Sequence, residues 1–183
     1  ISCIMGRPCN PQVESVGASF SNDIILVTGQ CGAVNTGITF DSIAANTIAD
    51  TWSVGSHFKL CWSFSQSSDI NSYKVTVDSK FSIVGVYATD ARCTLGRQCT
   101  INVAGHGLSG SHSIAIVRAA SSCLWHLLDD GISTSIGQNP VSSDAQDPSS
   151  YDVGILQSAD VTIQRSLCWS HEVSTDGTGY VLT

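Results

Sequence analysis

The feature that most constrains this chain is a cysteine pattern that occurs twice. The heptapeptide Cys-Ile-Met-Gly-Arg-Pro-Cys at 3–9 recurs ninety residues later, at 93–99, as Cys-Thr-Leu-Gly-Arg-Gln-Cys. In each copy a third cysteine follows an apolar run. A fourth lies in a Leu-Cys-Trp-Ser tetrapeptide that begins at Leu60 and again at Leu167. A repeat on this scale means that one structural unit is present twice.

The repeat predicts two domains. The chain has 183 residues, which is enough for two small domains. We predict a first domain over 1–80 and a second over 81–183, with an insertion at about 129–155. A strand expected at Phe81–Thr89 precedes the cysteines of copy two, whereas only two residues precede Cys3 in copy one. We therefore expect the first domain to lack its first strand, although a sequence trimmed at both ends would look the same.

The hydropathy pattern is typical of β-strands. Apolar and polar residues alternate along Phe58–Phe64 and Tyr73–Val77, which indicates strands with one buried face. We expect Thr100–Ala104 and Ser113–Val117 to form a hairpin-like pair around a glycine-rich turn. About seven short strands per repeat predict an all-β fold of two tandem immunoglobulin-like Greek-key β-sandwich domains with disulfides. One short helix is expected at Cys123–Asp130.

The cysteines indicate disulfides rather than a metal site. Their number, eight, is even, and the C-x5-C spacing is not one that zinc sites use. Four cysteines per domain allow three connectivities, of which we favour one short and one long pair in each copy. The favoured pairs are Cys3 with Cys9, Cys31 with Cys61, Cys93 with Cys99, and Cys123 with Cys168. Disulfides need an oxidising compartment, so we predict a secreted or cell-surface protein.

Residues around the second heptapeptide resemble a known domain family. Ile-Val-Gly-Val-Tyr at 83–87 leads into the cysteines, and Thr-Ile-Asn-Val-Ala-Gly-His-Gly-Leu follows at 100–108. This order resembles the opening of an IPT/TIG domain, which has an immunoglobulin-like fold. The added cysteines and the later Cys-Trp are similar to tandem repeats in surface proteins of unicellular eukaryotes. Copy one matches less, because Ser15 replaces a glycine. The resemblance implies an extracellular sandwich for spacing, adhesion or assembly, without catalytic residues.

Composition excludes several classes of protein. Only 13% of the residues are charged and the net charge is −7, a poor match for nucleic acid, which needs a basic surface. A chain with 42% hydrophobic residues is not intrinsically disordered. No apolar run approaches the roughly 18 residues of a membrane helix. We expect no cofactor, no nucleic-acid partner and no membrane span.

No constellation of catalytic residues is evident. Gly107–Ser111 is a near miss to the Gly-x-Ser-x-Gly nucleophile elbow, but it lacks the final glycine and falls in a predicted β-turn. The histidines show no metal-ligand spacing, so no metal site is expected. They are His57, His106, His112, His126 and His171.

Two groups of residues are weak candidates for ligand binding. Aspartates between Asp129 and Asp152 could offer oxygen ligands to calcium, but no EF-hand spacing supports this, and a solvated acidic loop is favoured. Trp62 and Trp169 are repeated beside cysteines at strand positions, which favours core packing. Trp52 and Trp125 are not repeated, so they are better candidates for exposed contacts.

The two ends predict an assembly interface. Aligning the copies places 180–183 over 73–76, so the sequence stops within a strand. An unpaired sheet edge is a template for another chain. We predict that residues at both ends form the interface: Ile1, Ile4, Tyr180, Val181 and Leu182.

Three functions are weighed. We favour a structural, non-enzymatic extracellular protein, a self-associating subunit of a surface filament or coat joined head to tail through β-strand edges. The alternative is an adhesin-like module that binds a glycan or a receptor through Trp125 and the insertion. A secreted hydrolase that uses Ser109 is the least supported. The chain has no Asn-x-Ser/Thr sequon, so any attached sugar would be O-linked.

Overall fold

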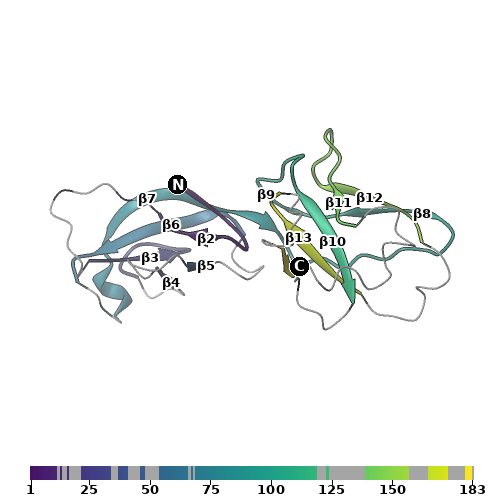
Figure 1. Ribbon diagram of the computed structural model, residues 1–183. Helices are drawn as coiled ribbons and strands as arrows, with labels where there is room; N and C mark the ends of the chain where they lie inside the picture. Colours follow the sequence, from purple (N-terminus) through teal and green to yellow (C-terminus); the bar gives the residue numbers. More distant parts are fainter. Residues whose placement is uncertain are drawn as a thin grey trace. The chain divides into compact units, whose positions relative to one another are not determined.

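Figure 1 shows the computed structural model, in which strands dominate the described chain. The described residues contain four disulfides and a 3-10 turn at Ile70–Ser72, but no α-helix. No helix among them is long and apolar enough to cross a membrane. The all-β prediction is confirmed. The helix predicted at Cys123–Asp130 lies outside the described residues, except for Cys123. The structure describes residues 1–11, 13, 16, 22–33, 37–40, 46–47, 54–65, 67, 69–118, 123, 139–156, 165–172 and 180–182.

The chain divides into two compact units. Unit 1 comprises Ile1–Ile48 and Gly55–Ile83, and unit 2 comprises Ala49–Val54 and Val84–Thr183. The division after Ile83 falls three residues beyond the one predicted after residue 80. The reason is burial, because Phe81 and Ile83 both belong to the apolar core of unit 1.

Unit 1 has a main sheet and a separate strand pair. The main sheet is hydrogen bonded in the order β1 (Ser2–Ile4), β7 (Val75–Val86), β6 (Gly55–Ser63), β3 (Asp23–Val27) and β4 (Gly37–Phe40). In the separate pair, β2 (Pro8–Cys9) runs antiparallel to β5 (Asn46–Thr47). The heptapeptide thus supplies one strand to each sheet.

Unit 2 has a similar arrangement. Its main sheet follows the order β11 (Val141–Ser142), β10 (Ser113–Arg118), β13 (Arg165–Ser170) and β14 (Val181–Leu182). A separate pair joins β8 (Gln98–Asn102) to β12 (Ser150–Ile155), and β9 (Gly105–His106) pairs with the end of β7. In β8 the buried residues alternate with exposed ones, as a strand with one buried face requires.

The two units repeat the same strand register. Ile24 of β3 lies opposite Trp62 of β6, and Ile114 of β10 lies opposite Trp169 of β13. The next pair along places Ile25 opposite Cys61 and, in unit 2, Ala115 opposite Cys168. The sequence repeat is therefore also a structural repeat, at least for its central strand pair.

The central strands bury both of their faces. In unit 1, Leu60 packs on one side with the Cys3–Cys9 disulfide, and Cys61 packs on the other with Tyr73. Successive strand residues point to opposite faces, which explains the two clusters. In unit 2, Cys168 likewise clusters with Tyr180. The long disulfide thus lies on the face opposite that of its neighbouring tryptophan, as the alternation predicts.

The predicted hairpin around Gly105 is wrong. β8 pairs with β12, and β10 pairs with β11 and β13, so the two strands belong to different sheets. The intervening glycine turn explains this difference, because Gly105–His106 hydrogen bonds to β7 as the chain passes between the sheets. A Cβ on Gly105 would lie 2.3 Å from the carbonyl oxygen of Gly85, so this close approach requires glycine.

The predicted insertion at about 129–155 includes part of the repeated unit. β12 pairs with the Cys99 strand as β5 pairs with the Cys9 strand. Val141, Tyr151 and Val153 are buried. Residues 150–155 are therefore the counterpart of β5, which is too short to leave a recognisable pattern in the sequence.

The strands predicted at Tyr73–Val77 and Phe81–Thr89 form a single strand, β7. Its Phe81 and Ile83 lie opposite Phe58 and Gly55 of β6 in unit 1, and its last two residues pair with β9 in unit 2. Unit 2 takes only the last three residues of β7. The first strand that unit 1 was expected to lack therefore corresponds, in unit 2, to only the three residues Val84–Val86.

Phe81→Ala tests this division of the chain. The ring is fully buried in unit 1, so we expect a loss of about 3–5 kcal/mol in the unfolding free energy of unit 1. Hydrogen exchange resolved by peptide would show the loss of protection in β3 and β6 and leave β10 and β13 unchanged. Protection lost in unit 2 instead would favour the boundary at residue 80.

Candidate functional site

The predicted assembly residues of unit 1 lie along its edge strand. β1 has β7 on one side, and the described residues place no strand on its other side. Ile1 is half exposed, and its amino group lies 2.6 Å from Oδ2 of Asp78. That ammonium group lowers the pKa of the Asp78 carboxyl. Ile4 is half buried. An open depression beside the strand is lined by residues 1–4 and 7–11.

In unit 2 the predicted residues belong to the edge strand β14 and the residue before it. β14 pairs with β13 on one side, and no further strand is described on the other. Tyr180, by contrast, is buried, and its hydroxyl lies 2.8 Å from the Ser113 hydroxyl. Tyr73 makes the equivalent bond in unit 1, to the carboxylate of Asp23 at 2.8 Å. Tyr180 therefore serves the core of unit 2, and Val181 and Leu182 supply the edge backbone.

The tryptophans differ between the units. Trp169 is fully buried, as predicted. Trp62 is only half buried and meets the exposed ring of Phe64 edge-on at 5.4 Å. Trp52 and Trp125, the weak ligand candidates, lie outside the described residues.

The turn before β10 contains a hydrogen-bonded group of serines and histidines. His112 is fully buried, and its Nδ1 accepts a hydrogen bond of 3.1 Å from the backbone amide of Ser109. Its Nε2 lies 2.9 Å from Nδ1 of His171, which follows β13. The His112 ring also meets the Trp169 ring edge-on at 4.9 Å. Sequence reasoning missed this pair because its members are 59 residues apart.

The contacts define the tautomers of the two rings. A backbone amide is always a donor, so Nδ1 of His112 carries no proton. The neutral ring therefore carries its proton on Nε2 and donates it to Nδ1 of His171. Burial, followed by the neighbouring His171 ring, lowers the pKa of His112 to about 4. The contacts thus require a neutral His112 ring and an unprotonated Nδ1 on His171.

This geometry does not suit the hydrolase reading of Ser109. Its hydroxyl bonds to that of Ser111 at 2.8 Å, and Nδ1 of His112 is occupied by the Ser109 backbone amide. A nucleophilic serine needs a base within hydrogen-bond reach of its hydroxyl. The His112 ring, with one nitrogen occupied and the other protonated, offers no such base.

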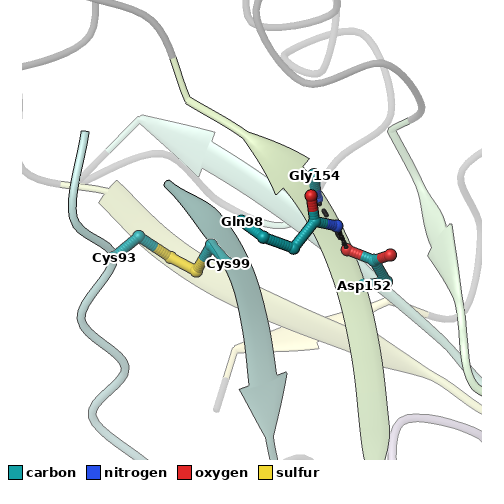
Figure 2. Close-up of a disulfide and its surroundings, with 5 residues drawn as sticks. All are labelled: Cys93, Gln98, Cys99, Asp152 and Gly154. Atoms are coloured by element: carbon teal, nitrogen blue, oxygen red, sulfur yellow. Dashed lines mark hydrogen bonds between the residues drawn. A yellow bond between two sulfur atoms is a disulfide. The ribbon is translucent and has the colours of Figure 1, made fainter. Parts of the chain in front are cut away.

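The described aspartates of the acidic stretch bond to their own neighbourhood. Asp144 accepts from the amide of Gln146, and Asp147 accepts from the amide and hydroxyl of Ser149. Figure 2 shows Asp152 held between Gln98 and the amide of Gly154, beside the Cys93–Cys99 disulfide. Within the described ranges no three potential ligands gather as a metal site would require. These carboxylates stabilise turns and a β-bulge.

The cysteines pair as favoured from the sequence. The bonds are Cys3–Cys9, Cys31–Cys61, Cys93–Cys99 and Cys123–Cys168, with Cα–Cα distances of 5.5–5.8 Å. These distances are normal for disulfides. Four disulfides in a chain of this size fit an oxidising environment.

Comparison with known proteins adds no identification. Neither a protein-family model, nor a curated protein, nor a solved structure matches this chain.

Removing the disulfides should separate their contributions to stability. The Cys31→Ala/Cys61→Ala variant opens a loop with a sequence separation of 30, against 6 for Cys3→Ala/Cys9→Ala. Loop-closure entropy predicts a loss of about 4 kcal/mol for the long bond and about 2 kcal/mol for the short one. Urea unfolding of unit 1, followed by hydrogen exchange, measures both. An equal or reversed order would show that packing, rather than chain entropy, sets these values.

Proposed function

We propose that this chain is a structural, non-enzymatic protein of the cell exterior. It acts as a repeating subunit of a surface filament or coat, and its units join through β-strand edges. Each unit is an immunoglobulin-like Greek-key sandwich of the IPT/TIG kind. Two separate sheets per unit, a repeated register and a long disulfide on the central strand support this proposal.

One observation carries the proposal, namely the path of β7. This strand contributes Val75–Ile83 to unit 1 and Val84–Val86 to unit 2, so at this passage the chain goes from one unit to the next within a single strand. A strand that serves two successive units is a direct way to extend an array. The edge strands β1 and β14 offer backbone to which a further strand could add.

The low charge content and the exposed apolar side chains favour a protein that assembles over one that stays a free monomer. Charged residues are 13% of the chain, against about 25% in an average globular chain. Large apolar side chains are exposed in both units, among them Phe64 in unit 1 and Ile155 in unit 2. A surface with few charged residues and scattered apolar ones suits packing against copies of the same chain. The adhesin alternative depends on Trp125 and stays a prediction.

Proline at each edge tests strand addition. Ser2→Pro in β1 and Leu182→Pro in β14 remove a backbone donor from an edge strand. We expect each change to lower the fraction of assembled chain by about tenfold in sedimentation velocity, because an added strand loses a hydrogen bond and its register.

Strand-compatible changes at the same positions, Ser2→Thr and Leu182→Val, are the matched controls and should assemble as the unaltered chain does. Electron microscopy of concentrated protein with its disulfides intact should show the filament or coat directly. A uniform monomer under these conditions would refute the proposed function.

A further inference from the structure

The His112–His171 pair has a property that the proposed function does not use. The two rings hold the turn at Gly107–His112 against the end of β13 through one hydrogen bond between imidazoles. The His112 backbone adds two more ties, because its amide donates to the Ser109 carbonyl and its carbonyl accepts from the Ser143 amide. His112 is thus the point where the turn, β13 and the chain after β11 meet.

Protonation is incompatible with this arrangement. A proton on Nδ1 of His112 would face the Ser109 amide, 3.1 Å away, and donor would oppose donor. A proton on Nδ1 of His171 would in the same way face the N–H of His112. Either event removes a hydrogen bond and places a charge next to a buried ring, which is costly without a compensating partner.

Among the described residues, the hydrogen bonds and ring contacts of His112 include no carboxylate that could balance such a charge. Its hydrogen bonds go to Ser109 and His171, and its ring packs on Trp169 and His171. Among the described residues, the titratable or charged groups on the neighbouring elements are Arg118 in β10, Arg165 in β13, His171 and Glu172 after β13, Asp144 after β11, Tyr151 and Asp152 in β12, and Tyr180 before β14. Of these, Asp144 caps Gln146, and Tyr180 bonds to Ser113.

We propose that the His112–His171 pair is an acid-sensitive latch, which holds the Gly107–His112 turn on β13 while both imidazoles are neutral and releases it when one is protonated. The latch belongs to unit 2 alone. In unit 1 the aligned position is Asn22, which is also buried but does not titrate. Unit 1 of the same chain therefore serves as an internal control for the pH response.

The direction of the pH effect follows from linkage. The pKa of His112 is lowered in the closed state to about 4 from an ordinary value of 6.5. The open state therefore binds more protons between pH 6.5 and 4, and closure is favoured above this window and lost as pH falls through it. From these values the opening equilibrium of the turn should rise about tenfold or more between pH 7.5 and pH 5.

Hydrogen exchange of the full chain tests the latch. At pH 7.5, 6 and 5, after correction for the intrinsic exchange rate, peptides covering 107–117 should lose protection as the pH falls. The aligned strand β3 in unit 1 should keep its protection. Loss of protection in both units to the same degree would overturn the proposal, because it would indicate general acid unfolding.

His112→Asn places the unit 1 residue in unit 2 and should abolish the acid-specific opening. His57→Asn removes an exposed histidine of unit 1 and should leave the opening unchanged. An acid response that persists in His112→Asn would overturn the latch.

If His112→Asn fails to fold, NMR spectroscopy of the unaltered chain provides a second test. Nitrogen-15 side-chain spectra should show the Nε2–H tautomer of His112, with titration well below pH 6.5. A His112 ring that titrates at or above pH 6.5 would overturn the latch. Assembly measured at pH 7.5 is independent of this result, so failure of the latch and failure of the proposed filament are distinguishable.

Discussion

The antiparallel pairing of one apolar strand with one cysteine strand is the interaction on which each unit depends. β3 with β6, and β10 with β13, bring an isoleucine opposite a tryptophan and an apolar residue opposite a cysteine. In unit 1 the cysteine forms the long disulfide on one face of the strand, while Leu60 beside it packs into the cluster on the opposite face. Because the side-chain period of a strand is two, a slip of one residue would exchange the two faces and break both arrangements.

The local part of this fold is predictable from the sequence, and the long-range part is not. Alternation identifies the strand through Leu60 and places Cys61 on the opposite face, and the repeated spacing favours the disulfide pairs that the structure contains. Strand partners are chosen over longer distances. β8 selects β12 instead of the nearby β10, because Gly105 approaches β7 and carries the chain to another sheet. The His112–His171 pair gives no signal in the sequence for the same reason.

The two copies differ at the residue just before β3 and β10, and in the burial of the tryptophan on the paired strand. Position 22 is Asn in unit 1, and the aligned position 112 is His in unit 2. Trp169 lies fully buried beneath the His112 ring, while Trp62 is half buried beside the exposed Phe64. The tyrosine that bonds to the first residue of the apolar strand is retained in both, as Tyr73 and Tyr180. The shared bonds maintain the fold, and the diverged residues Asn22 and His112 give the two units different buried contacts at this end.

The undivided strand β7 also affects where a protease could cut this chain. Proteases cut where the backbone is exposed and free to open, which in most tandem proteins is the linker between domains. At the passage through β7, residues Phe81–Val86 are all buried or half buried, and this stretch pairs with β6 and then with β9. An enzyme that cuts within Phe81–Val86 would first have to open the pairing of β7 with its neighbours, so the continuous strand protects this stretch of backbone from cleavage.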